Sequence, residues 1–256
     1  MNLIIDIGNT FVKMVSLDGD TIRQERVTLA DEEQIRLFCY RQPFEAGIYC
    51  SVVDLPERIE QLLSELPFPM LRYQSGVTPI PLRSRYLTPL TLGADRMAAA
   101  VGASMQWPAR NILIVDLGTC ATFDFVSCDG EYLGGNISPG ASMRLKAMHQ
   151  FTGRLPLVEL EGETPPFGTD TATAIRCGAL TGLQMEIEGY ARRYSRTFER
   201  LIVCLTGGGD GMSLDLPDVE VHYDQYLVPR GLNEILKWNR QSVRDELFET
   251  DRRTYI

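Results

Sequence analysis

Short apolar runs separated by polar turns form the start of the chain. Residues 3–5 predict a buried strand, which ends at the polar segment Asp-Ile-Gly-Asn-Thr over residues 6–10. Residues 11–17 continue in an extended pattern, and Asp18-Gly19 is a favourable pair for a tight hairpin turn. A third strand is expected over residues 21–27. The pattern therefore predicts three strands joined by two polar turns.

The rest of the chain alternates between helical and extended patterns, interrupted by proline-rich stretches at residues 67–89 and 152–166. Helices are predicted over residues 31–40, 56–66, 93–105, 140–150 and 171–198, and from residue 230 onward. Strands are predicted over residues 47–53, 71–73, 112–115, 121–126, 132–133 and 201–205.

The predicted helix over residues 171–198 is unusually long and spans roughly 40 Å at the standard rise. Its apolar face is expected to consist of Ile175, Ala179, Leu183, Ile187, Tyr190 and Tyr194. Gly178 and Gly182 lie one turn apart and are predicted on the same side, where they would let another helix approach closely.

The opening pattern returns in the middle of the chain. Asp6 and Gly8 correspond to Asp116 and Gly118, each 110 residues further on (116 − 6 and 118 − 8). The Asp-Gly pair at residues 18–19 corresponds to the one at residues 129–130, with one insertion. This internal repeat predicts two lobes of similar topology, which we place at residues 1–110 and 111–256.

Each Asp-x-Gly turn carries groups that suit a phosphate. Glycine lets the backbone approach an anion without a side-chain clash, and the side chains of Asn9, Thr10 and Thr119 can donate hydrogen bonds to phosphate oxygens. The aspartate is useful there only if a cation lies between it and the phosphate. The alternative is a pair of ordinary hairpins with polar turns.

A glycine cluster follows the predicted strand over residues 201–205. The sequence Thr-Gly-Gly-Gly-Asp at residues 206–210 suits contact with adenosine or phosphate, but a plain strand-to-helix turn has the same composition. Neither a Walker loop nor a dinucleotide fingerprint is present, because no Gly-Lys-Ser/Thr occurs and no Gly-x-Gly-x-x-Gly opens a helix after the first strand.

Asp95 stands at the start of a predicted helix, next to Arg96. The helix dipole and the guanidinium both favour an ionised carboxylate there, which can accept a proton from an attacking hydroxyl. The alternative is an acid that caps the helix and pairs with its neighbour.

Composition excludes several classes of protein. The formal net charge is −9 over 256 residues, which opposes non-specific binding to nucleic acid. The six cysteines include no Cys-x-x-Cys pair, so no zinc half-site is present. No apolar run is long enough for a membrane span, and the N-terminus lacks the pattern of a signal peptide. A reduced, cytoplasmic protein is expected, with no membrane and no nucleic-acid partner.

The chain resembles the type III pantothenate kinases, which belong to the acetate kinase–hexokinase–actin ATPase superfamily. The resemblance covers nearly the whole chain and depends on the segments Asp6–Lys13, Tyr86–Arg96, Asp116–Thr122, Tyr132–Gly140, Leu155–Pro156, Gly168–Thr171, Thr206–Gly208 and Gly231–Asn233. The resemblance implies an α/β fold of two duplicated ribonuclease H-like lobes, with the active site in the cleft between them. It also implies phosphorylation of the primary hydroxyl of pantothenate by ATP, the first step of coenzyme A biosynthesis.

The resemblance assigns roles to individual residues. Asp95 is expected to be the catalytic base, Asp6 to hold Mg²⁺, and Asp116 to coordinate K⁺ or NH₄⁺. The implied ATP and phosphate contacts are Asp6, Gly8, Asn9, Thr10, Lys13, Thr119, Gly207 and Gly208. The implied acceptor contacts are Tyr86, Gly93, Ala94, Asp95, Arg96 and Thr171. Thr171 would reach the acceptor from a second subunit, because the family is homodimeric, and the long helix is the expected dimer contact.

One residue departs from the family pattern, since Cys120 stands where alanine is more common. A thiol in the phosphate loop is expected to make activity sensitive to alkylation. Two other functions remain open from the residues, namely a superfamily kinase for another small hydroxy acid or sugar, and a non-enzymatic regulator on the same fold. The three acidic residues favour an enzyme over the regulator.

Overall fold

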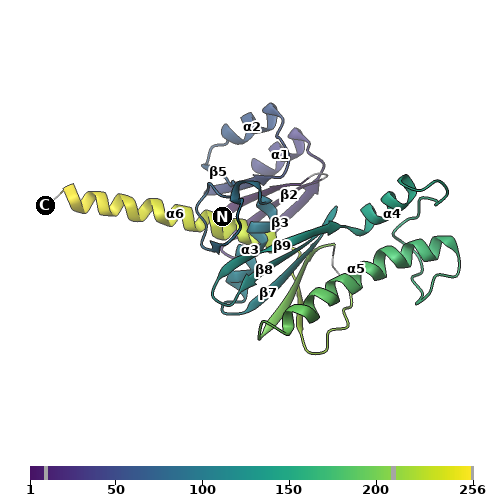
Figure 1. The fold of residues 1–256 in the computed structure, drawn as a ribbon. Coiled ribbons are helices and arrows are strands. Elements are labelled where there is room, and N and C mark those ends of the chain that lie inside the picture. Colours follow the sequence, from purple (N-terminus) through teal and green to yellow (C-terminus); the bar gives the residue numbers. More distant parts are fainter. Residues whose placement is uncertain (9–10, 209–211, 255–256) are drawn as a thin grey trace. The chain divides into compact units, whose positions relative to one another are not determined.

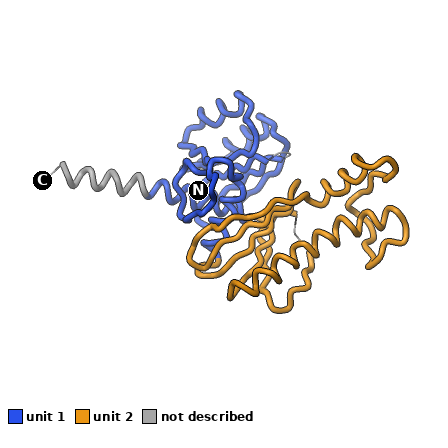
Figure 2. Tube along the Cα trace, in the orientation of Figure 1, with its two compact units in different colours: residues 1–106, 226–256 blue, residues 107–225 orange. Residues whose placement is uncertain are grey.

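The chain forms two compact units. The computed structural model describes residues 1–8, 11–208 and 212–254, with side chains through residue 241. Unit 1 comprises residues 1–106 and 226–256, and unit 2 comprises residues 107–225 (Figure 2). The two-part division follows the expectation, but residues 226–256 had been expected in the second lobe and belong to unit 1 instead.

Unit 1 is built on a five-stranded sheet in the order β3-β2-β1-β4-β5. The first three strands are antiparallel neighbours, whereas β4 runs parallel to β1 and β5 parallel to β4. The elements of unit 1 are β1 (Asn2–Ile7), β2 (Val12–Asp18), β3 (Thr21–Thr28), α1 (Glu32–Cys39), β4 (Ala46–Ser51), α2 (Glu57–Ser64), β5 (Met70–Arg72), β6 (Arg83–Ser84), the 3-10 helix η1 (Pro89–Thr91), α3 (Ala94–Gln106) and α6 (Leu227–Thr254).

Helices cover both faces of this sheet. Leu3 and Ile5 of β1 pack in one core with Ile35 of α1 and Ile59 of α2, so α1 and α2 lie on the same face (Figure 1). The alternate residue Ile4 is also fully buried, and α3 and α6 contact β4, with α6 also against β1. A continuous apolar run is what a strand with two covered faces requires.

Two glycines explain why α6 belongs to unit 1. A Cβ atom at Gly231 would lie 1.7 Å from the carbonyl oxygen of Ala98, and one at Gly102 would lie 2.4 Å from that of Leu227. The backbones of α3 and α6 are therefore in direct contact, which only glycine permits. Sequence periodicity cannot show which lobe a terminal helix packs against, and this is why the expected lobe boundary was wrong for residues 226–256.

Unit 2 repeats the same topology. Its sheet contains the strands β9-β8-β7-β10-β11 in this order, with β7, β8 and β9 antiparallel and β10 and β11 parallel to β7. The duplicated α/β fold predicted from the internal repeat is therefore confirmed. The elements of unit 2 are β7 (Asn111–Leu117), β8 (Cys120–Ser127), β9 (Glu131–Pro139), α4 (Ala141–Gln150), α5 (Thr171–Ser195), β10 (Leu201–Gly207) and β11 (Glu220–Tyr223).

The long helix α5 packs on this sheet through part of its predicted apolar face. Leu183 and Ile187 are buried in one core with Phe123 of β8. Gly178, in contrast, is exposed, and a Cβ atom there would have no neighbour within 4 Å. The prediction that Gly178 shares the buried face was wrong, because adjacent helix positions differ by about 100° and Gly178 precedes the buried Ala179.

Three short elements were not predicted, namely β6, η1 and β11. All three have four residues or fewer, too few to show a period. No helix in the described part of the chain has the length and apolarity needed to cross a membrane.

Candidate active site

The turn after β1 places Asp6 at the end of a buried strand. Its cross-strand partner in β2 is Lys13, and its neighbour in β4 is Cys50. The Cys50 thiol donates a hydrogen bond to Asp6 Oδ1 at 3.4 Å, and the Gly8 N–H donates to the carbonyl of Phe11 at 2.9 Å to close the turn. Asn9 and Thr10, which were predicted to contact phosphate, lie outside the described residues.

The Asp6 carboxyl group is unusually hard to ionise. Burial raises its pKa most, and the negative charge of Asp95 raises it further, from 3.8 to about 6. The Cys50 hydrogen bond and the Lys13 charge lower the pKa in part. Two carboxyl groups, from β1 and α3, therefore lie close enough in unit 1 to repel each other. Such a pair is typical of a site that binds a cation.

Asp95 is held at the first turn of α3. Its Oδ1 accepts a hydrogen bond from the Arg96 N–H at 2.8 Å, and a Cβ atom at Gly93 would lie 2.5 Å from this same oxygen. A larger residue at position 93 would force this carboxylate to move. Arg96 is 7% exposed and Ala94 is buried, so the Gly-Ala-Asp-Arg segment is anchored in unit 1.

A cavity of about 680 Å³ opens beside this segment within unit 1. Gly93 and Ala94 line it, together with Tyr73 and Ser75. The Tyr73 hydroxyl lies 3.4 Å from that of Ser75, and burial raises the pKa of Tyr73 to about 12, so the phenol stays protonated. The cavity is large enough for a small metabolite and has hydroxyl groups in its wall. Of the predicted acceptor residues, Tyr86, Asp95 and Arg96 are not among those that line it.

Lys13 is fixed by two neighbours in unit 1. Its ammonium lies 3.4 Å from Glu25 Oε1 and 5.3 Å from the centre of the Tyr226 ring. The Tyr226 hydroxyl donates to Glu25 Oε2 at 2.7 Å. Because cation–π attraction and the carboxylate both restrain it, the lysine has little freedom.

The second Asp-x-Gly turn lies in unit 2 and follows β7. The Gly118 N–H donates to the carbonyl of Cys120 at 3.0 Å, as Gly8 does in the first turn. A Cβ atom at Gly207 would lie 2.4 Å from Asp116 Oδ1, and Gly207 has a φ of +68°. Thr119 and Gly208 are exposed beside this turn. The structure therefore brings Asp116, Thr119, Gly207 and Gly208 together.

In unit 2, the residue directly opposite Asp116 is Thr122 of β8. In unit 1, the corresponding position opposite Asp6 is held by Lys13 of β2. Directly opposed residues lie on the same face of a sheet. The Thr122 hydroxyl oxygen is buried and has no hydrogen-bond partner within the part of the chain that the structure describes. A buried hydroxyl beside a carboxylate leaves two oxygen atoms that suit a cation.

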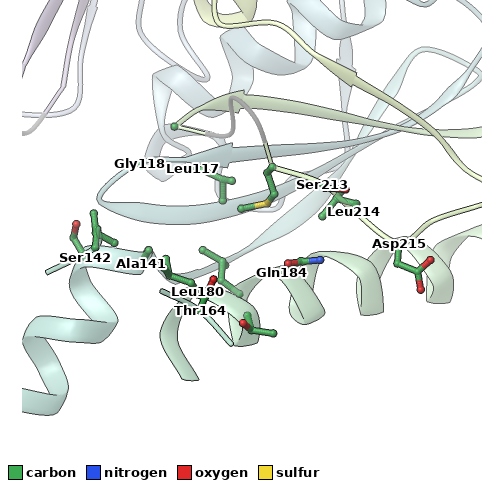
Figure 3. Close-up of a pocket in the computed structure, with 16 residues that line it drawn as sticks. Leu117, Gly118, Ala141, Ser142, Thr164, Leu180, Gln184, Ser213, Leu214 and Asp215 are labelled. Atoms are coloured by element: carbon green, nitrogen blue, oxygen red, sulfur yellow. The ribbon is translucent and has the colours of Figure 1, made fainter. Parts of the chain in front are cut away.

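A second cavity, of about 940 Å³, lies in unit 2 (Figure 3). Gly118 and Gly140 line it at the turn, and Gly208 lines it after β10. Further parts of its wall are Leu180, Thr181, Leu183 and Gln184 of α5, residues 212–215, and Leu160 and Thr164. A Cβ atom at Gly140 would lie 2.3 Å from the Gly118 carbonyl, so the start of α4 is pressed against the turn. The cavity extends from the Asp-x-Gly turn at residues 116–118 towards α5. This shape suits a nucleoside joined to phosphates.

Other predicted residues lie apart from these cavities. Thr171 is exposed at the first position of α5, whose N-terminus is closed by a capping box of Asp170 and Thr173. Among the residues that the structure describes, no group of three or more His, Cys, Asp or Glu side chains could hold a metal ion. A metal at these turns therefore needs ligands from bound phosphates or water.

Several residues of the two sites were missed by sequence analysis. Cys50 reaches Asp6 only because β4 pairs with β1, and Tyr73 reaches the cavity only because β5 pairs with β4, so no local pattern indicates them. Gln184 and Glu188 do carry a signal, because a polar pair at i and i+4 interrupts the apolar face of a long helix.

Two units of one topology, each with an Asp-x-Gly turn at its first hairpin, define the actin-like ATPase fold. Among solved structures, a Campylobacter jejuni protein named for the Baf family of transcriptional activators matches with a TM-score of 0.60 and 22% identity, covering 93% of this chain and 99% of that one. A Sinorhizobium meliloti protein named as a 2-dehydro-3-deoxygalactonokinase matches with a TM-score of 0.55 and 12% identity, covering 92% and 98%. At such identities these similarities show the fold alone.

The chain belongs to the type III pantothenate kinase family. The model of the family described as type III pantothenate kinase matches residues 2–193. A type III pantothenate kinase of Bacteroides fragilis is 46% identical over 248 residues, which cover 95% of this chain and 100% of the relative. The family expected from the sequence motifs is confirmed.

Proposed function

We infer that this protein transfers the γ-phosphoryl group of ATP to the primary hydroxyl of pantothenate, which gives 4′-phosphopantothenate and ADP. The observation that carries this inference is membership of a kinase family along nearly the whole chain. Asp95 beside Asp6 in unit 1 supports it, because a base and a metal-binding carboxylate are the two acids that the reaction needs. The reaction is the first step of coenzyme A biosynthesis.

Asp95 acts as the base. The pantothenate oxygen attacks the γ-phosphorus while the bond to the β,γ-bridging oxygen breaks, and the hydroxyl proton passes to the Asp95 carboxylate. Because the transition state is loose, the carboxylate mainly orients the hydroxyl and accepts its proton late. The hydrogen bond from the Arg96 N–H holds this carboxylate.

The cavity of unit 1 receives the acceptor. Gly93 and Ala94 form part of its wall, and Arg96 and Tyr86 are proposed to bind pantothenate through its carboxylate and its polar chain. A guanidinium can bind a carboxylate through two parallel hydrogen bonds, which are stronger where water is scarce, and Arg96 is 7% exposed.

The phosphates are proposed to bind at both turns. Asp6 would hold Mg²⁺, and Lys13 contributes a positive charge. Hydrogen bonds to the phosphates come from the backbone of Gly8, Gly207 and Gly208 and from the hydroxyl of Thr119. The side chains of Asn9 and Thr10 are proposed to donate hydrogen bonds to the phosphates as well. When bound, Mg²⁺ neutralises charge that develops on the phosphate oxygens.

A monovalent cation, K⁺ or NH₄⁺, is proposed to bind at Asp116. The unpartnered hydroxyl of Thr122 opposite this carboxylate supports the assignment, since a large monovalent ion prefers several oxygen ligands. The Asp116 carboxylate and the Thr122 hydroxyl would hold the ion.

A homodimer formed through α5 is proposed to complete the acceptor site. The face of α5 opposite the core exposes Gly178, Gly189 and Met185, which is 64% exposed. Small residues let a second helix approach closely, and Thr171 at the start of α5 would then reach the acceptor of the other subunit. Met185→Glu should yield a monomer by light scattering with much reduced activity; a fully active monomer would exclude this arrangement.

The six cysteines suit a reducing compartment, because none of them forms a disulfide. ATP and pantothenate are also metabolites of the cytoplasm, where we propose that the enzyme works.

The proposed function is tested by ADP release with pantothenate in K⁺, NH₄⁺ and Na⁺ buffers. Turnover is expected in K⁺ or NH₄⁺ and should be slight in Na⁺. Rates in Na⁺ equal to those in K⁺ would contradict the assignment of a K⁺ or NH₄⁺ site at Asp116. Activity on a sugar with none on pantothenate would assign a different acceptor.

A further inference from the structure

A buried carboxylate beside the cavity of unit 2 has no role in the reaction described above. Glu188 lies on α5 and is 6% exposed. A carboxylate buried in this way must accept hydrogen bonds from several donors. It accepts from the Gln184 side-chain Nε2 at 3.0 Å, from the Asp215 backbone N–H at 2.9 Å and from the Arg192 guanidinium at 3.4 Å.

These bonds attach the segment 212–215 to α5. Arg192 also donates to the Asp215 backbone carbonyl and, at 3.1 Å, to its Oδ2. Glu188 and Arg192, one turn apart, therefore hold Asp215 from both sides. The segment and α5 form two adjoining walls of the cavity.

The same carboxylate fixes the direction of the Gln184 amide. A carboxylate can only accept, so Gln184 must present its NH₂ group to Glu188, and its carbonyl oxygen points the other way. Figure 3 shows the amide along α5, with its nitrogen on the side of Asp215 and its oxygen on the side of Leu180. Gln184 lines the cavity, which thus contains a fixed hydrogen-bond acceptor in its α5 wall.

A fixed acceptor at this place distinguishes nucleobases by their exocyclic groups. The end of the cavity at the Asp-x-Gly turn of unit 2 is lined by Gly118, Gly140 and Gly208. A nucleoside whose phosphates lie at this end directs its base towards α5. Adenine carries an amino donor at C6, whereas hypoxanthine carries a carbonyl acceptor at the same atom and would set two acceptors against each other.

We propose that Gln184, positioned by Glu188, is a specificity-determining residue that accepts a hydrogen bond from the exocyclic amino group of the donor adenine. The proposal depends on the proposed use of ATP. Glu188 is a positioning residue, because it acts on the base only through Gln184 and the segment 212–215. One neutral hydrogen bond corresponds to a preference of about three- to tenfold for ATP over ITP.

The test is equilibrium binding of nucleotides with Mg²⁺ by calorimetry, without pantothenate. The unaltered protein should bind ATP about three- to tenfold more tightly than ITP, and purine riboside triphosphate, which has neither group, should lie between them. Gln184→Met keeps the chain length but removes the acceptor and should bring the ATP-to-ITP ratio close to one.

Glu188→Gln should give an intermediate ratio, because an amide offers one acceptor oxygen to three donors. The matched control is Glu186→Gln on the same helix, where Glu186 binds Arg144 and lies outside the cavity lining. Its ratio should equal that of the unaltered protein. Thermal unfolding of each variant shows whether it is folded. The comparison of ATP, ITP and purine riboside triphosphate on the unaltered protein tests the proposal even if a variant fails to fold.

Equal affinities for ATP and ITP, an unchanged ratio in Gln184→Met, or no binding of either nucleotide would each overturn the proposal. The outcome is separate from the fate of the proposed function. If the ratios follow the prediction but pantothenate is not phosphorylated, the acceptor assignment fails and the base-reading role stands.

Discussion

The Asp-x-Gly turns of unit 1 and unit 2 share one strand pairing but place different residues opposite the aspartate. In unit 1, β2 sets Lys13 against Asp6, whereas in unit 2, β8 sets Thr122 against Asp116. The first turn therefore includes a positive charge of its own, and the second offers an unpartnered hydroxyl. Duplicated lobes can thus keep one fold while the residue opposite the aspartate is a lysine in one half and a threonine in the other.

In unit 1 a second carboxylate, that of Asp95, lies near the turn aspartate Asp6. Asp95→Asn should lower kcat about 1,000-fold, since removal of a general base costs about 100- to 10,000-fold. Steady-state ADP release measures this change. A binding titration with ATP is the control, and its affinity should hold; a variant with near-normal kcat would move the base elsewhere.

Asp6→Asn should separate stability from function in the turn of unit 1. Asp6 has a folded pKa of about 6 against 3.8 when unfolded, so the folded state binds more protons between these values. Stability of the metal-free protein is then highest below pH 3.8 and falls as the pH rises to 6, by about 3 kcal/mol in total at 1.36 kcal/mol per unit.

The asparagine variant should remove this loss and be about 3 kcal/mol more stable than the unaltered protein at pH 7.5 without Mg²⁺, while its kinase activity is lost. Urea unfolding at several pH values between 4 and 7.5 measures both curves. Parallel curves for the two proteins would show that the Asp6 carboxyl is not under strain from burial and Asp95.

Thr122→Val tests the turn of unit 2, because it removes the hydroxyl and keeps the shape. The K⁺ concentration for half-maximal activity should rise about tenfold, as is usual when a group around a metal is lost. A K⁺ titration in the ADP-release assay measures it, with the unaltered protein at constant ionic strength as reference. An unchanged K⁺ requirement would mean that Thr122 is not a ligand.

Tyr226→Phe should have the smallest effect. It removes the hydrogen bond to Glu25, which together with the ring restrains Lys13. One such bond corresponds to about a threefold rise in the KM for ATP, with kcat nearly unchanged. A fall in kcat with a constant KM would indicate that Lys13 acts in the transition state rather than in binding.

Sequence analysis predicted most of the elements and the two turns, because each arises from local alternation or helical periodicity. The strand over residues 112–115 and the helix over residues 171–198 appear in the structure as β7 and α5. The packing of α6 on α3 and the exposure of Gly178 were not predicted, since both depend on which surfaces meet in space. The same holds for Cys50 beside Asp6, a contact between strands that lie about forty residues apart.

The proposed K⁺ site in unit 2 is most directly tested by crystallography with Rb⁺, whose anomalous signal marks a K⁺ site, in the presence of a non-hydrolysable ATP analogue. We expect an anomalous peak within coordination distance of the Asp116 carboxylate and the Thr122 hydroxyl, and none between Asp6 and Lys13. A peak at the turn of unit 1, or an empty site at Asp116, would contradict the division of roles between the two turns.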